Sequence, residues 1–135
     1  MSTLSPLAAT LNVAIGGAFG AALRYQAGRA MTSYMGSQTV SVFPFPTLAV
    51  NTIGSLLIGL LAGWLARDAG SNDQLRLLLG VGLLGGFTTF SAFSLEVVMM
   101  IERGQYLFAG LYGILSVSLG ITGFMVGLGI MRTLS

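Results

Sequence analysis

The sequence predicts an all-α membrane protein with four transmembrane helices. Of its 135 residues, 54% are hydrophobic and only 7% are charged, and four long apolar segments divide the chain. A soluble domain carries roughly 25% charged residues, so we expect most of this surface to face lipid. A helix needs about 20 apolar residues to cross the hydrocarbon core. We expect helices at about 7–30, 46–66, 77–100 and 106–131, forming a single domain over 1–135.

Composition excludes most conventional enzyme and metal chemistry. The chain contains no cysteine, histidine or lysine. Disulfides, thiolate metal sites and Schiff-base lysines are therefore impossible, and the usual general base is missing. The net charge of +2 is too small to indicate a nucleic-acid partner. We expect a protein that is not an enzyme, binds no nucleic acid and is surrounded by a lipid bilayer.

The connections between the apolar segments are polar. Residues 32–46 include two prolines and a glycine, residues 67–76 form a polar turn, and residues 102–104 make the last connection very short. The third and fourth helices are therefore expected to be antiparallel neighbours. The first basic residue, Arg24, follows the first apolar stretch, whereas a signal peptide begins with a basic region. We interpret this first segment as a permanent helix.

The six arginines are balanced across the predicted membrane. Arginines near helix ends collect on the cytoplasmic side. Four spans place three arginines on each side: Arg67, Arg76 and Arg132 on one, and Arg24, Arg29 and Arg103 on the other. This balance predicts insertion in both orientations, and hence an antiparallel dual-topology homodimer, the two-chain analogue of an inverted repeat. The alternative, that a weak bias fixes one orientation, stays open.

Small residues four positions apart predict close contacts between helices. The pairs are Gly16/Gly20, Gly59/Gly63, Gly82/Gly86 and Gly123/Gly127. They indicate tight packing and do not specify one interface. Four helices also offer little interior in which to hide polar groups from lipid, which favours a second copy of the chain as partner.

The third apolar segment contains the most unusual stretch, Gly85-Gly86-Phe87-Thr88-Thr89-Phe90-Ser91-Ala92-Phe93-Ser94. Glycine and β-branched threonine are poor helix formers, so we expect the helix to break here, near mid-membrane. Irregular backbone at that depth is tolerated only inside protein or beside water. Freed carbonyl groups at such a break can coordinate a cation. The alternative is a kinked helix whose own hydroxyls satisfy its backbone.

Polar side chains form rows on two other helices. Thr47, Asn51 and Ser55 are four residues apart on the second, and Tyr112 and Ser116 are four apart on the fourth. Asn in membrane helices commonly bonds neighbouring helices. The second interpretation is a donor to a permeating anion, with the serine and tyrosine hydroxyls forming one wall of a polar pathway.

Aromatic and charged residues extend this candidate pathway. Phe90 and Phe93 share a helix face, and the electropositive edge of a ring can approach an anion without binding it tightly. Glu96 continues the face, and a carboxylate within or near the membrane is a functional candidate. Arg24 either reaches to the interface or attracts anions at a vestibule. For the phenylalanines, packing in the core or against lipid is the alternative.

Three motifs resemble the Fluc (CrcB) family of fluoride channels. They are Gly16-Gly17-Ala18-Phe19-Gly20-Ala21-Ala22-Leu23-Arg24-Tyr25, Thr47-Leu48-Ala49-Val50-Asn51, and the 85–94 stretch followed by Glu96. The resemblance covers nearly the whole chain. It implies an antiparallel dual-topology dimer with two fluoride pores, which exports cytoplasmic fluoride passively. It also implies residence in the cell membrane, the inner membrane in a Gram-negative bacterium.

The same resemblance assigns roles to individual residues. It implies a structural sodium ion at the dimer centre, held by the backbone carbonyls of Gly85 and Thr88. Taken with the position of Arg24, it implies an anion pathway that contains Thr47, Asn51, Phe90, Ser91, Phe93, Glu96, Tyr112, Ser116 and Arg24.

Two other functions fit part of the sequence. Small proton-coupled exporters of organic cations are also four-helix, dual-topology dimers, but they need a carboxylate in the first helix. This first helix has none, so Glu96 would have to serve instead. A structural membrane subunit is the other possibility, and it leaves the glycine-rich break and the aligned hydroxyls unexplained.

Overall fold

The computed structural model describes residues 4–67 and 72–134, and this part of the chain is helical. Part of the predicted polar turn, residues 68–71, lies outside the described residues. In chain order the elements are α1 (Pro6–Met35), α2 (Ser37–Val42), α3 (Phe45–Leu65), α4 (Asp73–Leu75), the π-helical η1 (Arg76–Leu84), α5 (Gly85–Phe87), α6 (Phe90–Glu102) and α7 (Tyr106–Thr133).

Within the described residues, four helical stretches are long and apolar enough to cross a membrane. They are Pro6–Met35, Phe45–Leu65, Asp73–Glu102 and Tyr106–Thr133, which confirms the four expected helices. Their large apolar side chains point outward in many places: Leu7 is 69% exposed, Ile114 66% and Met125 65%. Such a surface is stable in lipid and not in water.

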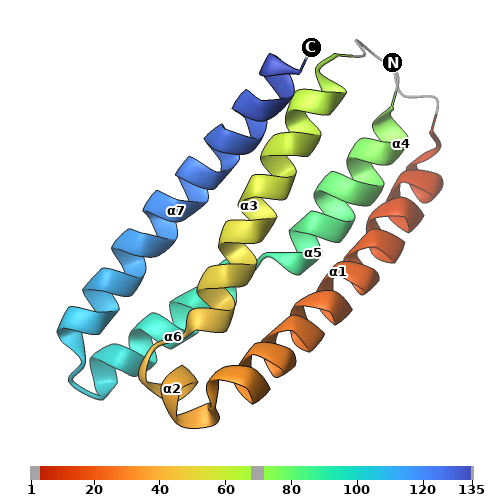
Figure 1. Ribbon diagram of the computed structural model, residues 1–135. Helices are drawn as coiled ribbons and strands as arrows, with labels where there is room; N and C mark the ends of the chain where they lie inside the picture. Colours follow the sequence, from red (N-terminus) through yellow and green to blue (C-terminus); the bar gives the residue numbers. More distant parts are fainter. Residues whose placement is uncertain (1–3, 68–71, 135) are drawn as a thin grey trace.

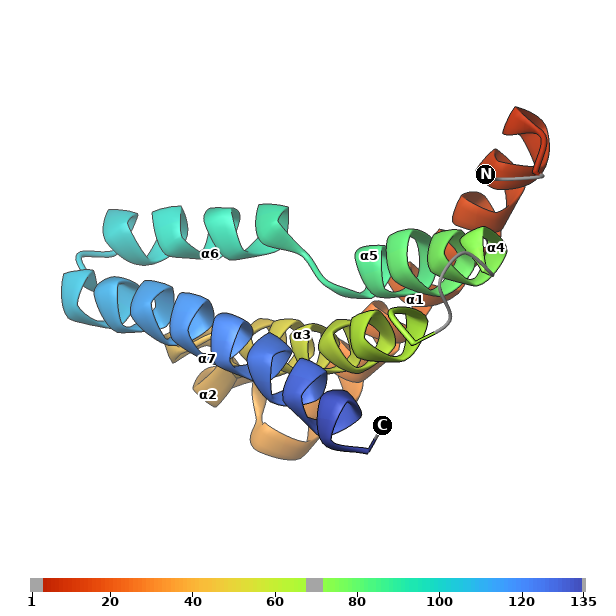
Figure 2. The same cartoon turned by 90° about the horizontal axis from the view of Figure 1, so that it is seen from above.

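The helices pack as two close pairs, shown in Figure 1. One pair is α1 with the η1–α5 stretch, and the other is α3 with α7. The remaining helix, α6, is joined to α5 by an extended link and lies over α3 and α7 in a separate layer (Figure 2). This layering places the N-terminal part of α6 against polar positions of α3 and α7.

Glycines bring α1 and the third helical stretch into backbone contact. A Cβ atom on Gly82 would lie 2.9 Å from the Val13 carbonyl oxygen and 3.0 Å from the Gly16 Cα. A Cβ atom on Gly86 would lie 2.7 Å from the Gly17 carbonyl oxygen. Real side-chain atoms do not fit at such distances, so this interface requires glycine on both helices.

The α3–α7 pair depends on glycine in the same way. A Cβ atom on Gly127 would lie 2.8 Å from the Leu60 nitrogen and 3.1 Å from the Gly59 carbonyl carbon. On Gly63 it would lie 2.6 Å from the Met131 Cβ. The prediction that small-residue pairs mark close helix packing is therefore confirmed for both helix pairs.

The first connection is more ordered than the sequence predicted. Helix α1 continues to Met35, Gly36 turns the chain with φ of 92°, and α2 follows in place of an irregular polar loop. The apolar end of this segment explains the difference, because the Phe43 ring is buried 5.4 Å from the Tyr112 ring centroid. The turn between α6 and α7 fixes α2 from the other side, since Arg103 Nη1 donates to the Ser41 carbonyl at 3.0 Å.

We expect Gly127→Ala to destabilise the protein, and Gly129→Ala to leave it unchanged or more stable. Both substitutions lie in α7 and have the same effect on helix propensity, but the space around Gly129 is open within 4 Å. Overpacking at Gly127 should cost about 1–3 kcal/mol. Thermal unfolding of the purified variants in detergent measures the difference. Equal midpoints would contradict the backbone contact.

Candidate functional site

The third helical stretch is interrupted at Thr88 and Thr89, which have extended backbone. Their φ and ψ angles are −83° and 157°, and −150° and 117°. Thr89 is the N-cap of α6, where its Oγ1 accepts a hydrogen bond from the Ala92 N–H at 3.1 Å. The extended link is visible between α5 and α6 in Figure 2. That it lies near the middle of the bilayer stays a prediction.

Asn51 on α3 pairs with the backbone of Thr89 in both directions. The Thr89 N–H donates to Asn51 Oδ1 at 2.8 Å, and Asn51 Nδ2 donates to the Thr89 carbonyl at 3.0 Å. The asparagine therefore bonds two helical segments, as Asn in membranes commonly does. Its second Nδ2 hydrogen is not needed for this pairing.

The interruption changes the hydrogen-bond partners of two backbone N–H groups, which in a continuous helix would donate to the carbonyls of Gly85 and Thr88. The Thr89 N–H would donate to the Gly85 carbonyl, and the Ala92 N–H to the Thr88 carbonyl. Instead the first donates to Asn51 Oδ1 and the second to Thr89 Oγ1. Gly85 is also exposed on the surface of the single chain. Two carbonyl oxygens relieved of helical donors fit a hard cation such as sodium.

The described residues do not gather charged metal ligands at this site. Within the residues that the structure describes, no group of three acidic, histidine or cysteine side chains could hold a metal ion. Arg24 on α1 instead contacts the same stretch, because its Nε donates to the Gly86 carbonyl at 3.2 Å. Neutral oxygens, those of the backbone carbonyls among them, are thus the ligands that the interruption offers to a cation.

A cavity of about 290 Å³ adjoins the interruption. Asn51, Thr89, Phe90, Phe93 and Ser116 are among the residues that line it. The two phenylalanine rings lie 5.7 Å apart between centroids. The Ser116 Oγ atom is buried and has no hydrogen-bond partner in the part of the chain that the structure describes. A buried hydroxyl on a residue that lines a cavity needs a hydrogen-bond partner that the described residues do not supply.

Glu96 accepts one hydroxyl on each of its carboxylate oxygens. Thr47 Oγ1 donates to Oε1 at 2.7 Å, and the Tyr112 hydroxyl donates to Oε2 at 2.6 Å. Tyr112 is completely buried, and its ring lies 5.1 Å from that of Phe93. This group therefore joins α3, α6 and α7 through three side chains.

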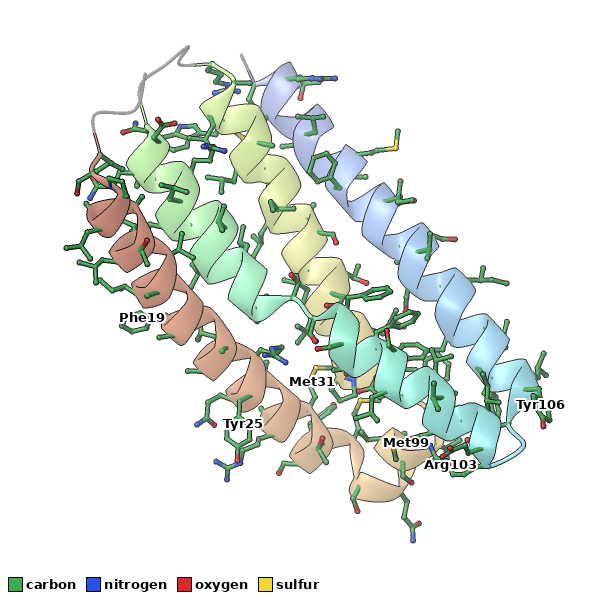
Figure 3. All side chains as sticks on the ribbon, turned by 180° about the vertical axis from the view of Figure 1, so that it is seen from behind. Phe19, Tyr25, Met31, Met99, Arg103 and Tyr106 are labelled. Atoms are coloured by element: carbon green, nitrogen blue, oxygen red, sulfur yellow. The ribbon has the colours of Figure 1, made fainter. Side chains whose placement is uncertain are left out.

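A broad basin of about 840 Å³ opens at the α2 end of the molecule. Arg24, Arg29, Thr47 and Glu96 are among its lining residues. A smaller cavity of about 80 Å³, bordered by Arg24, Thr47 and Thr89, lies between the basin and the interruption. Figure 3 shows Tyr25, another basin residue, projecting outward from α1, while Arg103 and Tyr106 mark the turn between α6 and α7.

The predicted site residues thus fall into connected groups. Asn51, Phe90, Phe93 and Ser116 line the cavity, and Thr47, Glu96 and Tyr112 form the hydroxyl–carboxylate group. Ser91 is exposed, with its Oγ 3.2 Å from Thr89 Oγ1.

Two contacts at the interruption were missed from the sequence. One is the role of Thr89, which a hydroxyl residue placed directly before a helical run could have indicated. The other is the bond from Arg24 to the Gly86 carbonyl, for which the sequence carries no signal.

Comparison with known proteins decides the family. Residues 11–128 match the family described as CrcB-like protein, Camphor Resistance (CrcB). The chain belongs to the CrcB family. This confirms the resemblance inferred from its motifs, and with the four apolar helices it makes the chain a multi-pass membrane protein.

Proteins similar to this CrcB chain are named as ion channels and not as enzymes. It is 62% identical to the fluoride-specific ion channel FluC of Erythrobacter litoralis over 98% of both chains. It is 56% identical to the protein of the same name from Novosphingobium aromaticivorans, over 93% of this chain and 98% of that one. The FluC of Hyphomonas neptunium is 49% identical, over 90% and 94%.

We expect Tyr112→Phe to lower stability by about 1.5–3 kcal/mol, because it removes a hydrogen bond to a carboxylate. Tyr34→Phe is the matched control, since Tyr34 is 92% exposed. In a Glu96→Gln background the loss should be smaller by roughly 1 kcal/mol. Thermal unfolding of the four variants gives this double-mutant cycle. An equal loss in both backgrounds would show that the two side chains act independently.

Proposed function

We propose that this protein is a fluoride-selective channel for passive export of cytoplasmic fluoride, with two pores at the interface of an antiparallel homodimer. Its relatives in the family are named fluoride-specific ion channels. The observation that carries the proposal is the cavity beside the interruption, which is lined by Asn51, by the Phe90–Phe93 pair and by Ser116, whose buried hydroxyl has no partner among the described residues. The protein acts in the cell membrane, which is the inner membrane in a Gram-negative bacterium.

The chemistry of this cavity suits a small, strongly hydrated anion. A pore must replace the hydration shell with donors, yet release the ion again. The second Asn51 N–H, the Ser116 hydroxyl and the ring edges of Phe90 and Phe93 are donors of this moderate strength. Arginine is absent from the lining residues of the cavity, so no full positive charge holds the ion there.

The basin at the α2 end is the vestibule of this pathway. Arg24 and Arg29 lie along it, and positive charge in a concave surface raises the local concentration of anions. Thr47 and Glu96 border the same basin, and Tyr112 connects them to Phe93. Glu96 holds both hydroxyl groups in fixed positions along the route. Ser91, on the exposed face of α6, lines the part of the pathway closed by the second chain.

The second copy of the chain completes each pore. Phe90 is 79% exposed in the single chain although it lines the cavity, and Gly85 is exposed as well. An inverted copy against this face covers both residues and brings the two interruptions together. The carbonyls of Gly85 and Thr88 from both chains then hold a structural sodium ion. They are free to bind it because the Thr89 and Ala92 N–H groups donate to side-chain oxygens instead.

Purified protein in liposomes should release fluoride and retain chloride, as followed with ion-selective electrodes. Phe90→Ile and Asn51→Asp should each reduce fluoride efflux by about tenfold or more, the effect of losing one contact of roughly 1.4 kcal/mol. Phe19→Ile, a change of the same kind at an exposed α1 position, should retain wild-type flux. Equal chloride and fluoride flux in the wild type would rule out the selective channel.

Dual insertion can be measured because the natural chain lacks cysteine. In intact cells, a membrane-impermeant maleimide should label about half of the Tyr34→Cys chains, because about half of the chains would have each orientation. Adding Asn72→Lys and Gln74→Lys should shift the labelled fraction strongly, because positive charge retains that loop in the cytoplasm. Complete labelling or complete protection without the lysines would mean a single orientation.

A further inference from the structure

The pair formed by Asn51 and Thr89 connects the two ion sites of the proposed channel. Asn51 uses its Oδ1 and one Nδ2 hydrogen on the Thr89 backbone, at 2.8 and 3.0 Å. The same side chain lines the 290 Å³ cavity. One asparagine therefore contacts the anion cavity and the backbone of the interruption at the same time.

The pair also determines which carbonyls are free. Asn51 Oδ1 takes the N–H that would otherwise return to the Gly85 carbonyl. When Thr89 is extended, its Oγ1 caps α6. It accepts the hydrogen bond of the Ala92 N–H, which in a continuous helix would donate to the Thr88 carbonyl. Two side-chain oxygens thereby release two backbone oxygens, one at the start of α5 and one in the interruption itself.

We infer that Asn51 and Thr89 are positioning residues for the cation site, so that sodium binding depends on a residue of the anion pathway. The inference rests on the structural sodium ion of the proposed function. Without the Asn51 oxygen, the Thr89 N–H returns to the Gly85 carbonyl and competes with the cation for it. Without the Thr89 hydroxyl, the Ala92 N–H does the same at the Thr88 carbonyl.

A second consequence concerns the order of events in assembly. The pair lies within one chain and involves α3 and the start of α6. Each protomer therefore presents its carbonyls before it meets its partner. Sodium then joins two sites that are already formed, which lowers the entropy lost on dimerisation.

The test is the sodium dependence of thermal unfolding, measured on purified protein in detergent with sodium chloride or N-methyl-D-glucamine chloride. Wild-type protein should unfold at a higher temperature in sodium. In Asn51→Ala and in Thr89→Val, the sodium concentration for half of this shift should rise by about tenfold, the factor that one competing hydrogen bond supplies. A purely structural defect would instead lower the unfolding temperature equally in both salts.

The Thr89 variants keep the test decisive if Asn51→Ala does not fold. Thr89→Ser retains the capping hydroxyl, so it should keep a sodium midpoint near that of the wild type, whereas Thr89→Val should not. Thr52→Val is the matched control on α3, because the Thr52 hydroxyl donates to the Leu48 carbonyl of its own helix at 2.7 Å. It should keep both the midpoint and the fluoride flux.

Measuring fluoride efflux on the same preparations separates this inference from the proposed function. Wild-type flux with no sodium-dependent shift would overturn the inference and leave the channel standing. A wild-type sodium midpoint in both Asn51→Ala and Thr89→Val would also overturn it, since Asn51 would then serve the anion alone. If wild-type protein transports no fluoride but its unfolding temperature still rises in sodium, and this rise disappears in the two variants, the result would support the inference and contradict the channel.

Discussion

The reciprocal hydrogen bonds between Asn51 and Thr89 are the interaction on which the rest of the site depends. A bilayer core supplies no water to backbone groups, so extended residues there need protein partners. Asn51 provides both a donor and an acceptor to Thr89, at 3.0 and 2.8 Å. With Thr88 and Thr89 extended, α6 leaves the axis of α5 and crosses over α3 and α7, which brings Phe93 and Glu96 to Tyr112. A continuous third helix would carry these side chains elsewhere.

Glycine packing makes room for this arrangement. Because Gly82 and Gly127 permit backbone contact within each helix pair, little apolar volume is needed to hold the four long helices together. Gly54 has a more local role, since a Cβ atom there would lie 3.3 Å from the Phe87 ring and would also meet the Thr88 methyl group. Small residues thus position the interruption, while the polar side chains of Asn51, Thr89 and Ser116 line the cavity beside it. This division suits a membrane protein with only 7% charged residues.

The sequence was sufficient to predict the four helices and which residues share a helix face. It was not sufficient to predict the hydrogen-bond partners of individual side chains. Length and hydropathy predict four spans, and four-residue spacing predicts the contacts at Gly59 and Gly127. The same spacing places Thr47 and Asn51 on one face of α3. It does not show that Asn51 would meet a backbone 38 positions away, because periodicity gives no information on the opposing helix. The bond of Arg24 to the Gly86 carbonyl in α5 and the short helix α2 were missed for the same reason, since both depend on contacts made after packing.

The most direct test of this account is the backbone conformation of the interruption in a lipid bilayer. Solid-state NMR chemical shifts of labelled Thr88 and Thr89 report whether each residue is extended or helical. If Asn51 holds Thr89 in extended conformation, both residues should give extended shifts in wild-type protein and shifts closer to helical values in Asn51→Ala, with Thr52→Val unchanged. Helical shifts in the wild type, or extended shifts that persist without Asn51, would contradict the claim that this asparagine holds the third helix open.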